Sequence, residues 1–586
     1  NFAFRTRPRY EDFDLMNSYE RIQFSKEVYD AGAKYKETPL AQACTYEGLM
    51  QMYMDRNITE EELKRKVNEL ERVNTDWFKL LTRNSFSHSH NLSVTGGTQK
   101  VSYTTSFGYN DEKGIELGNN SKRLSGRVRV GLELHPKVHV DISLIGQLGK
   151  NTGYGPEVNP LEYATNTSRA IPAFDENGKY LYQKKRASYK YWNGTLELNY
   201  NILNELENSY SQSKSQSINT TVNFSWDILP WLRYEFVGGV SSSENASESY
   251  AGEKSFYVSQ KYRGYDYSSV DPQSDRAKAA ILPFGGEFFT QNRNTLSYNI
   301  QNKLLVSKTF KEIHRLNIML GTEIRSTDNK SVSNTVWGYV PERGEQIMRP
   351  TAPNDLKPTT GTTPGKDLGI FEALYQNGWG KTSKTDNYFS LFATVAYSLK
   401  DRYVFNFNVR NDVSNRFGQD VNKRVDPTYS FGLSYRMAEE NFIKEYVPWL
   451  EQLNLRVTYG IQGNVVNSLS PDLIAKIRGV LPVYNQYYST VYQLPNPHLK
   501  WEKTKTWNLG LDLQLLRSIT MVLEYYGRTS NAIINQDIPQ EYGMDQMALN
   551  GGHITNEGIE YTINITPFNS ENFAWTIGLN SSKNWN

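Results

Sequence analysis

Clusters of aromatic side chains inside long polar stretches are the residues of this chain with the clearest potential for binding chemistry. Their flat faces can stack on sugar rings or on peptide side chains, and their hydroxyl and indole groups can form hydrogen bonds. We therefore predict substrate contacts at four clusters, which comprise Tyr189, Tyr191 and Trp192; Trp337 and Tyr339; Tyr375 and Trp379; and Tyr484, Tyr487 and Tyr488. Packing between loops, contact with a partner protein and positions at a membrane interface are alternative interpretations of these rings.

Residue patterns that would support catalysis or metal binding are weak. His88 and His90 would share one face of a strand, but the sequence places no carboxylate or cysteine beside them to complete a metal site. The segment 175–179 contains oxygen ligands without the spacing of an EF-hand, so an Asn-Gly turn is the better interpretation. The motifs of P-loop, HExxH and GxSxG enzymes do not occur. We expect no enzymatic activity, no metal and no cofactor.

Composition restricts the class of protein. The 586 residues carry a formal net charge of +2 with both signs interspersed, and no basic stripe indicates a nucleic-acid partner. The mean hydropathy is −0.64, and no apolar run approaches the ~18 residues that a membrane helix needs. An integral membrane protein of this composition must cross the bilayer with strands, because only alternate residues of a strand meet lipid. Cys44 is the single cysteine, which excludes an intrachain disulfide.

The segment 219–240 shows the pattern that defines the predicted fold. Apolar residues such as Val222, Phe224 and Phe236 alternate with polar ones such as Asn223 and Glu235. This period of two predicts a β-hairpin with one apolar and one polar face, turning at 227–231. In a membrane barrel, the apolar face would contact lipid and the polar face would line the lumen.

Similar hairpins recur along the chain, each with a short turn at one end and a long loop at the other. The long loops are expected at 149–215, 242–293, 326–386, 462–500 and 529–556, against turns of two to six residues. Short turns on one side and long loops on the other are typical of outer-membrane barrels, in which the long loops face outside. We therefore predict an all-β protein, a large antiparallel transmembrane β-barrel with about 17 strands present over residues 1–586.

A helical insert is predicted within this barrel over 12–87, on the extracellular side. Thr59 and Glu62 form a capping box ahead of a narrow apolar stripe, which predicts a helix over 60–73. The stripe favours packing on a larger surface, and an interface with a partner is the alternative. The chain opens at Asn1 without a signal peptide and stops soon after a strand, so we expect a mature piece or a fragment.

Short motifs in a fixed order resemble those of SusC/RagA-type TonB-dependent transporters. The segment 496–504, Asn-Pro-His-Leu-Lys-Trp-Glu-Lys-Thr, is similar to the NPxLKWE-T segment of that family. Residues 410–418 are similar to its RxDGSSRFG loop but depart from it at Val413, where the family usually has glycine. Further matches follow the family order at 76–109, 453–464 and 550–560. Taken one at a time, these motifs are explained by tight turns and bulges.

The resemblance implies a barrel of 22 strands around an N-terminal plug domain, with the plug and the last strands outside this sequence. It also implies TonB-dependent import of an oligosaccharide or a peptide across the outer membrane of a Gram-negative bacterium. The implied partners are a SusD-like lipoprotein lid, the TonB–ExbB–ExbD complex, outer-membrane lipid, and a second transporter–lid pair. A passive porin-like channel and a surface adhesion or assembly barrel are the alternatives.

Overall fold

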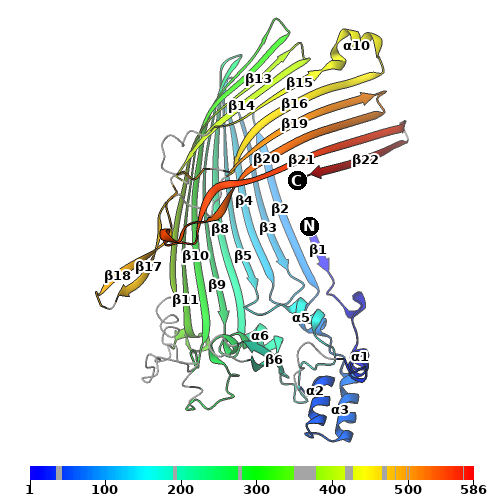
Figure 1. Cartoon of the computed structure of the whole chain (residues 1–586), viewed down its shortest axis with the longest axis vertical. Helices are drawn as coiled ribbons and strands as arrows, with labels where there is room; N and C mark the ends of the chain where they lie inside the picture. Colours follow the sequence, from blue (N-terminus) through cyan, green and yellow to red (C-terminus); the bar gives the residue numbers. More distant parts are fainter. Residues whose placement is uncertain are drawn as a thin grey trace.

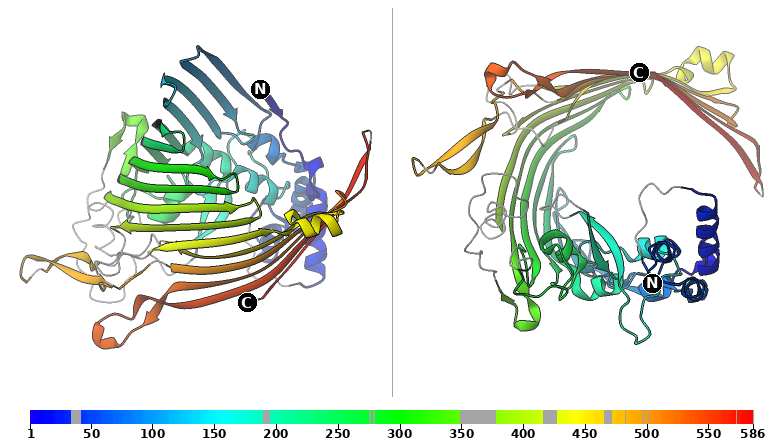
Figure 2. Two further views of the ribbon diagram at one scale, coloured as in Figure 1. Left: turned by 90° about the horizontal axis from the view of Figure 1, so that it is seen from above. Right: turned by 60° about the horizontal axis from the view of Figure 1, so that its bottom comes forward.

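One large antiparallel sheet dominates the computed structural model, which describes all residues except 34–41, 189–194, 275–276, 278–279, 349–377, 416–426, 465–471, 482, 497, 501, 572 and 586. The sheet contains 18 strands and curves around a central space (Figure 1, Figure 2). Each long strand pairs with the next along the sheet, from β1 at one edge to β22 at the other. The all-β prediction and the estimate of about 17 strands are confirmed.

The strands of this sheet differ widely in length. They are β1 Phe2–Arg5, β2 Ser85–Gly97, β3 Val101–Lys113, β4 Asn120–His135, β5 Val138–Gly153, β8 Ser209–Leu229, β9 Leu232–Ala251, β10 Gly286–Phe310, β11 His314–Val340, β12 Gln346–Ile347, β13 Trp379–Leu399, β14 Tyr403–Ser414, β15 Thr428–Arg436, β16 Leu450–Asn464, β19 Glu502–Leu515, β20 Ile519–Asp537, β21 Gln546–Asn569 and β22 Ala574–Trp585. Two separate hairpins pair β6 Gln183–Ser188 with β7 Thr195–Tyr200 and β17 Ile474–Leu481 with β18 Gln486–Gln493.

The sheet has one apolar and one polar face, as the alternation predicts. In the hairpin of β8 and β9, Phe224 lies opposite Phe236 and Ser225 lies opposite Glu235, so one face is largely apolar and the other largely polar. The turn is at 230–231, inside the predicted segment. In the pairing of β10 with β11, Leu304 lies opposite Leu320 on the same face, and both are exposed in the isolated chain. We call this apolar face the outer face and the polar one the inner face.

The strands extend further toward the long loops than the sequence predicts. β10 has 25 residues and β11 has 27, whereas about 9–11 residues suffice to cross a bilayer. The predicted loops 242–293 and 326–386 therefore shrink to 252–285 and 341–378. The added segment 241–249 of β9 is polar on both faces, so it shows no alternation. A strand with water on both sides leaves no periodic signal in its sequence.

Short turns gather at one end of the sheet and long connections at the other (Figure 1). At the 400–402 turn, Lys400 and Asp401 both have positive φ, the backbone that tight hairpins with right-handed twist require. One connection at this end is longer than predicted: between β15 and β16 it contains the 3-10 turn η5 (Met437–Glu439) and the helix α10 (Asn441–Tyr446). No helix in the described part of the chain is both long and apolar enough to cross a membrane.

Four helices occupy the connection between β1 and β2. They are α1 Ser18–Asp30, α2 Tyr46–Met54, α3 Glu60–Val73 and α4 Trp77–Leu81. The α3 bounds and its capping box at Thr59 and Glu62 agree with the prediction. Val67 and Leu70 of α3 are buried against Ile22 of α1 and Leu49 of α2, so the stripe packs within the protein.

A second hydrophobic core joins the helices to the loop between β5 and β8. That loop contains α5 Pro160–Asn166 and α6 Ile202–Asn208. Trp77 and Phe78 of α4 pack with Leu198 and Ile202, and with Phe256 of α7 (Phe256–Val258). The long connections therefore form packed structure over this end of the sheet.

Candidate functional site

The inner face carries a network of charged side chains that links four neighbouring strands. The Arg410 guanidinium donates to Glu323 Oε2 at 2.6 Å and to Asp412 Oδ1 at 2.7 Å. It also donates to Ser390 Oγ at 2.8 Å, and Gln301 Nε2 donates to the second oxygen of Glu323 at 3.1 Å. Because these residues lie on β10, β11, β13 and β14, the network holds the wall together across three strand pairings.

A second inner-face network lies on β16, β19 and β20. The Arg456 guanidinium contacts both oxygens of Asp512, at 2.9 and 2.8 Å, and Glu524 at 3.0 Å. Gly510 lies between them, and a Cβ there would approach the guanidinium to 3.1 Å. Each network contains one arginine and two carboxylates, so each adds a net formal charge of −1 to the inner face.

Among the predicted contact residues that the structure describes, Trp337 alone lies on the inner face of the sheet. It is opposite Glu287, and its indole donates to Tyr262 Oη at 3.1 Å. Glu287 accepts hydrogen bonds from Tyr257 at 3.0 Å, from Lys261 at 3.0 Å and from Tyr262. We call these five residues the loop-end cluster. Burial, followed by the charge of Glu287, raises the pKa of both tyrosines above the ordinary phenol value.

Tyr339 and Trp379 lie on the other face. Gly338 has a φ of +82°, and the register of β10 with β11 shifts between Gly286 and Glu287. This irregularity turns Tyr339 away from Trp337, and its ring stacks on Phe288 with centroids 4.6 Å apart. Trp379 begins β13 at an outer-face position and is 63% exposed. The sequence pair Trp337 and Tyr339 is therefore divided between the two faces.

The remaining aromatic candidates lie in different places. Tyr484, Tyr487 and Tyr488 belong to the β17–β18 hairpin, and Tyr484 and Tyr487 are 71% and 79% exposed. This hairpin projects away from the wall, outside the curve of the sheet (Figure 1, Figure 2). Tyr189, Tyr191, Trp192 and Tyr375 lie outside the described residues. The partners of Trp337 had no local sequence signal, because Glu287 and Tyr262 come from other elements.

The family-like motif at 496–504 acts as a strap between neighbouring strands. Asn496 is buried and its side-chain amide donates to the Ala548 carbonyl at 2.9 Å. The Asn550 side chain accepts from the Lys500 amide at 2.9 Å and donates to its carbonyl at 3.0 Å. Since Ala548 and Asn550 lie on β21, the motif fixes the base of the β16–β19 connection to that strand, in a structural role.

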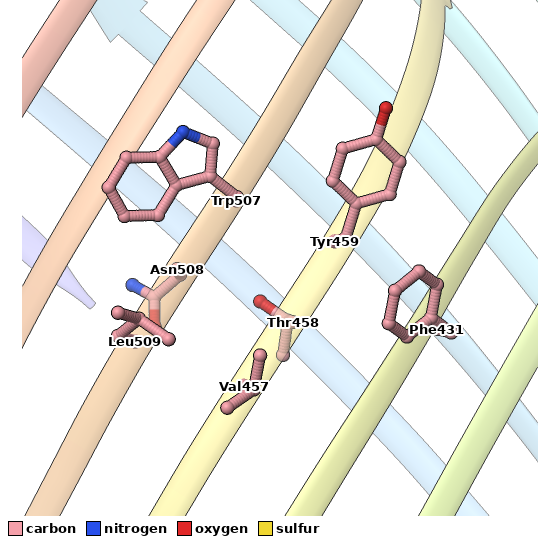
Figure 3. Close-up of a pocket in the computed structure, with 7 residues that line it drawn as sticks. All are labelled: Phe431, Val457, Thr458, Tyr459, Trp507, Asn508 and Leu509. Carbon is pink, nitrogen blue, oxygen red and sulfur yellow. The ribbon is translucent and has the colours of Figure 1, made fainter.

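An apolar hollow on the outer face is formed by Phe431, Val457, Tyr459, Trp507 and Leu509, and Thr458 and Asn508 also line it (Figure 3). Tyr459 pairs with Phe431 on one side and with Trp507 on the other. Trp507 in turn covers Gly527, where a Cβ would lie within 2.4 Å of the indole. A row of aromatic rings at the edge of an apolar outer face is the girdle of a membrane barrel, so this hollow faces lipid.

Among the weaker chemical candidates, Asp175 has a structural role. Asp175 Oδ1 accepts from the amides of Asn177 and Lys179 at 2.9 and 2.8 Å, which closes the predicted Asn-Gly turn. His88 and His90 share one face with their ring centroids 5.1 Å apart. Burial raises the pKa of the Cys44 thiol, which lowers its thiolate fraction. The described residues contain no group of three or more potential metal ligands.

Glu205 on α6 is a buried carboxylate in the loop core. One of its oxygens accepts from the Phe256 amide at 2.8 Å and from the Asn204 side chain at 3.0 Å. The other oxygen is buried with no hydrogen-bond partner among the described residues. Burial raises the pKa of Glu205 from 4.5 to about 7. The folded chain thus holds this proton more tightly than the unfolded chain, and loop stability falls as pH rises from about 4.5 through 7.

We predict that Glu205→Gln flattens this pH dependence, which amounts to roughly 3 kcal/mol for a pKa shift of this size. Hydrogen exchange of the segment 252–264, corrected for the pH dependence of the chemical exchange rate, measures the effect. Glu207→Gln, on the exposed side of the same helix, is the matched control and should leave the wild-type slope unchanged. An equal pH slope in wild type and Glu205→Gln would contradict the prediction.

Comparison with known proteins supports one family. Residues 68–585 match the family described as TonB dependent receptor-like, beta-barrel. The chain is 27% identical over 555 residues to the TonB-dependent receptor SusC of Bacteroides thetaiotaomicron, covering 88% of this chain and 48% of that protein. It is 24% identical over 525 residues to the TonB-dependent receptor P26 of Formosa agariphila, covering 87% and 47%.

Solved structures share the fold over the whole chain. The RagAB peptide importer in its closed-closed state superimposes with a TM-score of 0.68 at 18% identity, covering 100% of this chain and 60% of that one. Its open-open state gives a TM-score of 0.70 at 18% identity, covering 100% and 59%. The chain spans about half the length of the curated relatives that it matches. The chain belongs to the TonB-dependent receptor β-barrel family, as an outer-membrane barrel of the SusC/RagA type.

Proposed function

We propose that the chain is the barrel part of a TonB-dependent importer of a large nutrient, an oligosaccharide or a peptide. The observation that carries the proposal is the two-faced wall: an apolar outer face for lipid and a polar inner face crossed by two ionic networks. A large barrel built from such a wall would enclose an aqueous path. Among its relatives, SusC is a TonB-dependent receptor and RagAB is a peptide importer, which supports import over a passive role.

The partners belong to the same proposal. A SusD-like lipoprotein would cover the long-loop end, and the TonB–ExbB–ExbD complex would supply energy through the region before residue 1. Two transporter–lid pairs would associate in the membrane. Ligand binding and lid closure would favour one state of the plug and of its TonB segment, which is a shift between populations.

Trp337 is the aromatic candidate that we place in the substrate path, because it faces inward beside Lys261 and Glu287. A ring at this position can stack on a sugar or on an aromatic peptide side chain, while the charged neighbours hydrogen bond to polar groups. The other aromatic candidates remain proposed contacts of the loops with substrate or lid, apart from the hairpin tyrosines considered below.

The test begins with the intact protein purified in mild detergent and mass spectrometry of the bound molecules. Uptake of the identified glycan or peptide is then measured in cells with and without a protonophore. We expect protonophore-sensitive uptake, and we expect Trp337→Ala to weaken binding roughly two- to tenfold, since stacking contributes roughly 0.5–1.5 kcal/mol. Trp337→Phe, which keeps a ring, is the matched control. Uptake that persists without an energised membrane would favour a porin-like channel, and absence of uptake would favour an adhesion or assembly barrel.

A further inference from the structure

The β17–β18 hairpin is amphipathic, with an apolar and a basic face. Val480 lies opposite Tyr487, Ala475 opposite Val491, and Ile477 opposite Ser489, so these five apolar residues share one side, whereas Leu481 lies opposite Gln486 on the other. Ile477 is 75% exposed. Lys476 lies on the other side with its ammonium 3.6 Å from the centre of the Tyr492 ring, and Arg478 donates to Thr490 Oγ1 at 3.0 Å. A lone two-stranded hairpin is marginally stable in water, so an exposed apolar face of this kind needs a cover.

The connection that carries the hairpin leaves the wall just beyond the outer edge of the apolar outer face. On the outer face of β19, Trp507 of the aromatic girdle is followed toward the loop by Lys505, opposite Ile461, and then by Lys503. Tryptophan marks the edge of the acyl region, and lysine at the next outward positions marks the headgroup level. The ladder of β16 and β19 ends at Asn464 and Glu502, one residue past Lys503. The connection that carries the hairpin therefore leaves the wall at the level of the lipid headgroups.

The direction of the hairpin is away from the central space. It projects outward from the wall in each view (Figure 1, Figure 2). Hydrogen bonds from Asn496 and Lys500 to residues of β21 hold the base of the hairpin to the barrel. The sequence of 473–493 contains four tyrosines and aliphatic residues, and its charged residues are Lys476 and Arg478. Tyrosine, aliphatic side chains and basic residues together are typical of segments that lie in the membrane interface.

We propose that the β17–β18 hairpin is a membrane-surface anchor that lays its apolar face into the outer leaflet beside the barrel. Ile477, Val480, Tyr487 and Val491 contact the acyl boundary. Lys476 and Arg478 reach from the opposite face to anionic headgroup phosphates. This contact fixes the orientation of the β16–β19 connection at the long-loop end, and it is independent of the substrate that the barrel carries.

The test places a fluorescent bimane label at one face or the other in the full-length protein, with Cys44→Ser removing the native thiol. Tyr487→Cys labels the apolar face, and Tyr488→Cys, the next residue on the opposite face, is the matched control. The protein is reconstituted in vesicles of phosphatidylcholine alone or mixed with phosphatidylglycerol. Quenching by doxyl-labelled lipid reports contact with the bilayer, and quenching by iodide reports contact with water.

We expect lipid quenching at 487 and iodide quenching at 488, with stronger lipid quenching at 487 in the anionic vesicles. The pair Lys476→Glu and Arg478→Glu should remove this anionic enhancement and shift the equilibrium away from lipid by roughly fivefold or more, given the contribution of each basic residue near an anionic surface. Equal quenching of both labels by iodide would overturn the proposal. Protection of 487 from both quenchers would also overturn it, because a second copy of the chain would then be the cover.

Discussion

Replacing Leu320 by arginine is expected to lower the free energy of unfolding by about 2–4 kcal/mol, the cost of a basic residue on the lipid face near the bilayer midplane. Leu320 lies on the outer face of β11, opposite Leu304 of β10 and Ala393 of β13. Its side chain is 50% exposed in the isolated chain. No acidic side chain lies opposite it on either neighbouring strand to compensate the charge.

Asn317→Arg is the matched control for this substitution. Asn317 lies on the same strand, three residues closer to the short turn, and on the inner face, where it lies opposite Ser307 and Ala396. An arginine at this position contacts water, so the free energy of unfolding is expected to change by less than about 1 kcal/mol. Denaturant unfolding of the protein in phospholipid vesicles measures both variants. Equal losses at the two positions would contradict the assignment of the two faces.

Removing Arg410 is expected to cost about 2–3 kcal/mol, because Arg410→Met leaves buried acceptors without their cation. Glu323 is 8% exposed and would keep only its hydrogen bond from Gln301. Asp412 would keep its contact with Ser390. This loss is at the lower end of what breaking a buried ion pair costs, because the Arg410 side chain is 39% exposed and water partly screens its charge.

Two further variants distinguish the network from a simple surface pair. Arg129→Met breaks the ion pair between Arg129 and Asp141, whose side chains are 59% and 26% exposed, respectively. The expected loss of stability is at most about 1 kcal/mol, because both charges contact water. The double variant Arg410→Met with Glu323→Gln removes both the cation and one stranded carboxylate, so it should recover part of the lost stability. The same unfolding measurement applies. A double variant less stable than the sum of its single changes would argue against this account.

Local features of the sequence predict several elements closely. The capping box at Thr59 placed the start of α3, because the side-chain and backbone partners are three residues apart. The alternation in 219–240 predicted a hairpin whose turn and facing residues agree with the observed register. Both features depend on contacts between near neighbours along the chain, so a short window contains the whole signal.

The contact site could be predicted only in part. The aromatic density at 337–339 is visible in the sequence, but Gly338 and a register shift divide Trp337 from Tyr339. The partners Glu287 and Tyr262 lie 50 and 75 residues away from Trp337 along the chain. No spacing rule connects residues brought together by a loop that folds back onto a sheet.

The amino-acid sequence is sufficient to predict the two-faced strands, the asymmetry of turns and loops, the helix α3 and the family. These follow from the contrast between lipid and water on the two sides of a strand, which alternate residues record directly. The extension of β9, β10 and β11 beyond the apolar band becomes visible only in the folded sheet, because polar segments such as 241–249 show no alternation. The tertiary structure also decided which charges meet around Arg410, since pairing four strands in register is a property of the sheet and of no single segment.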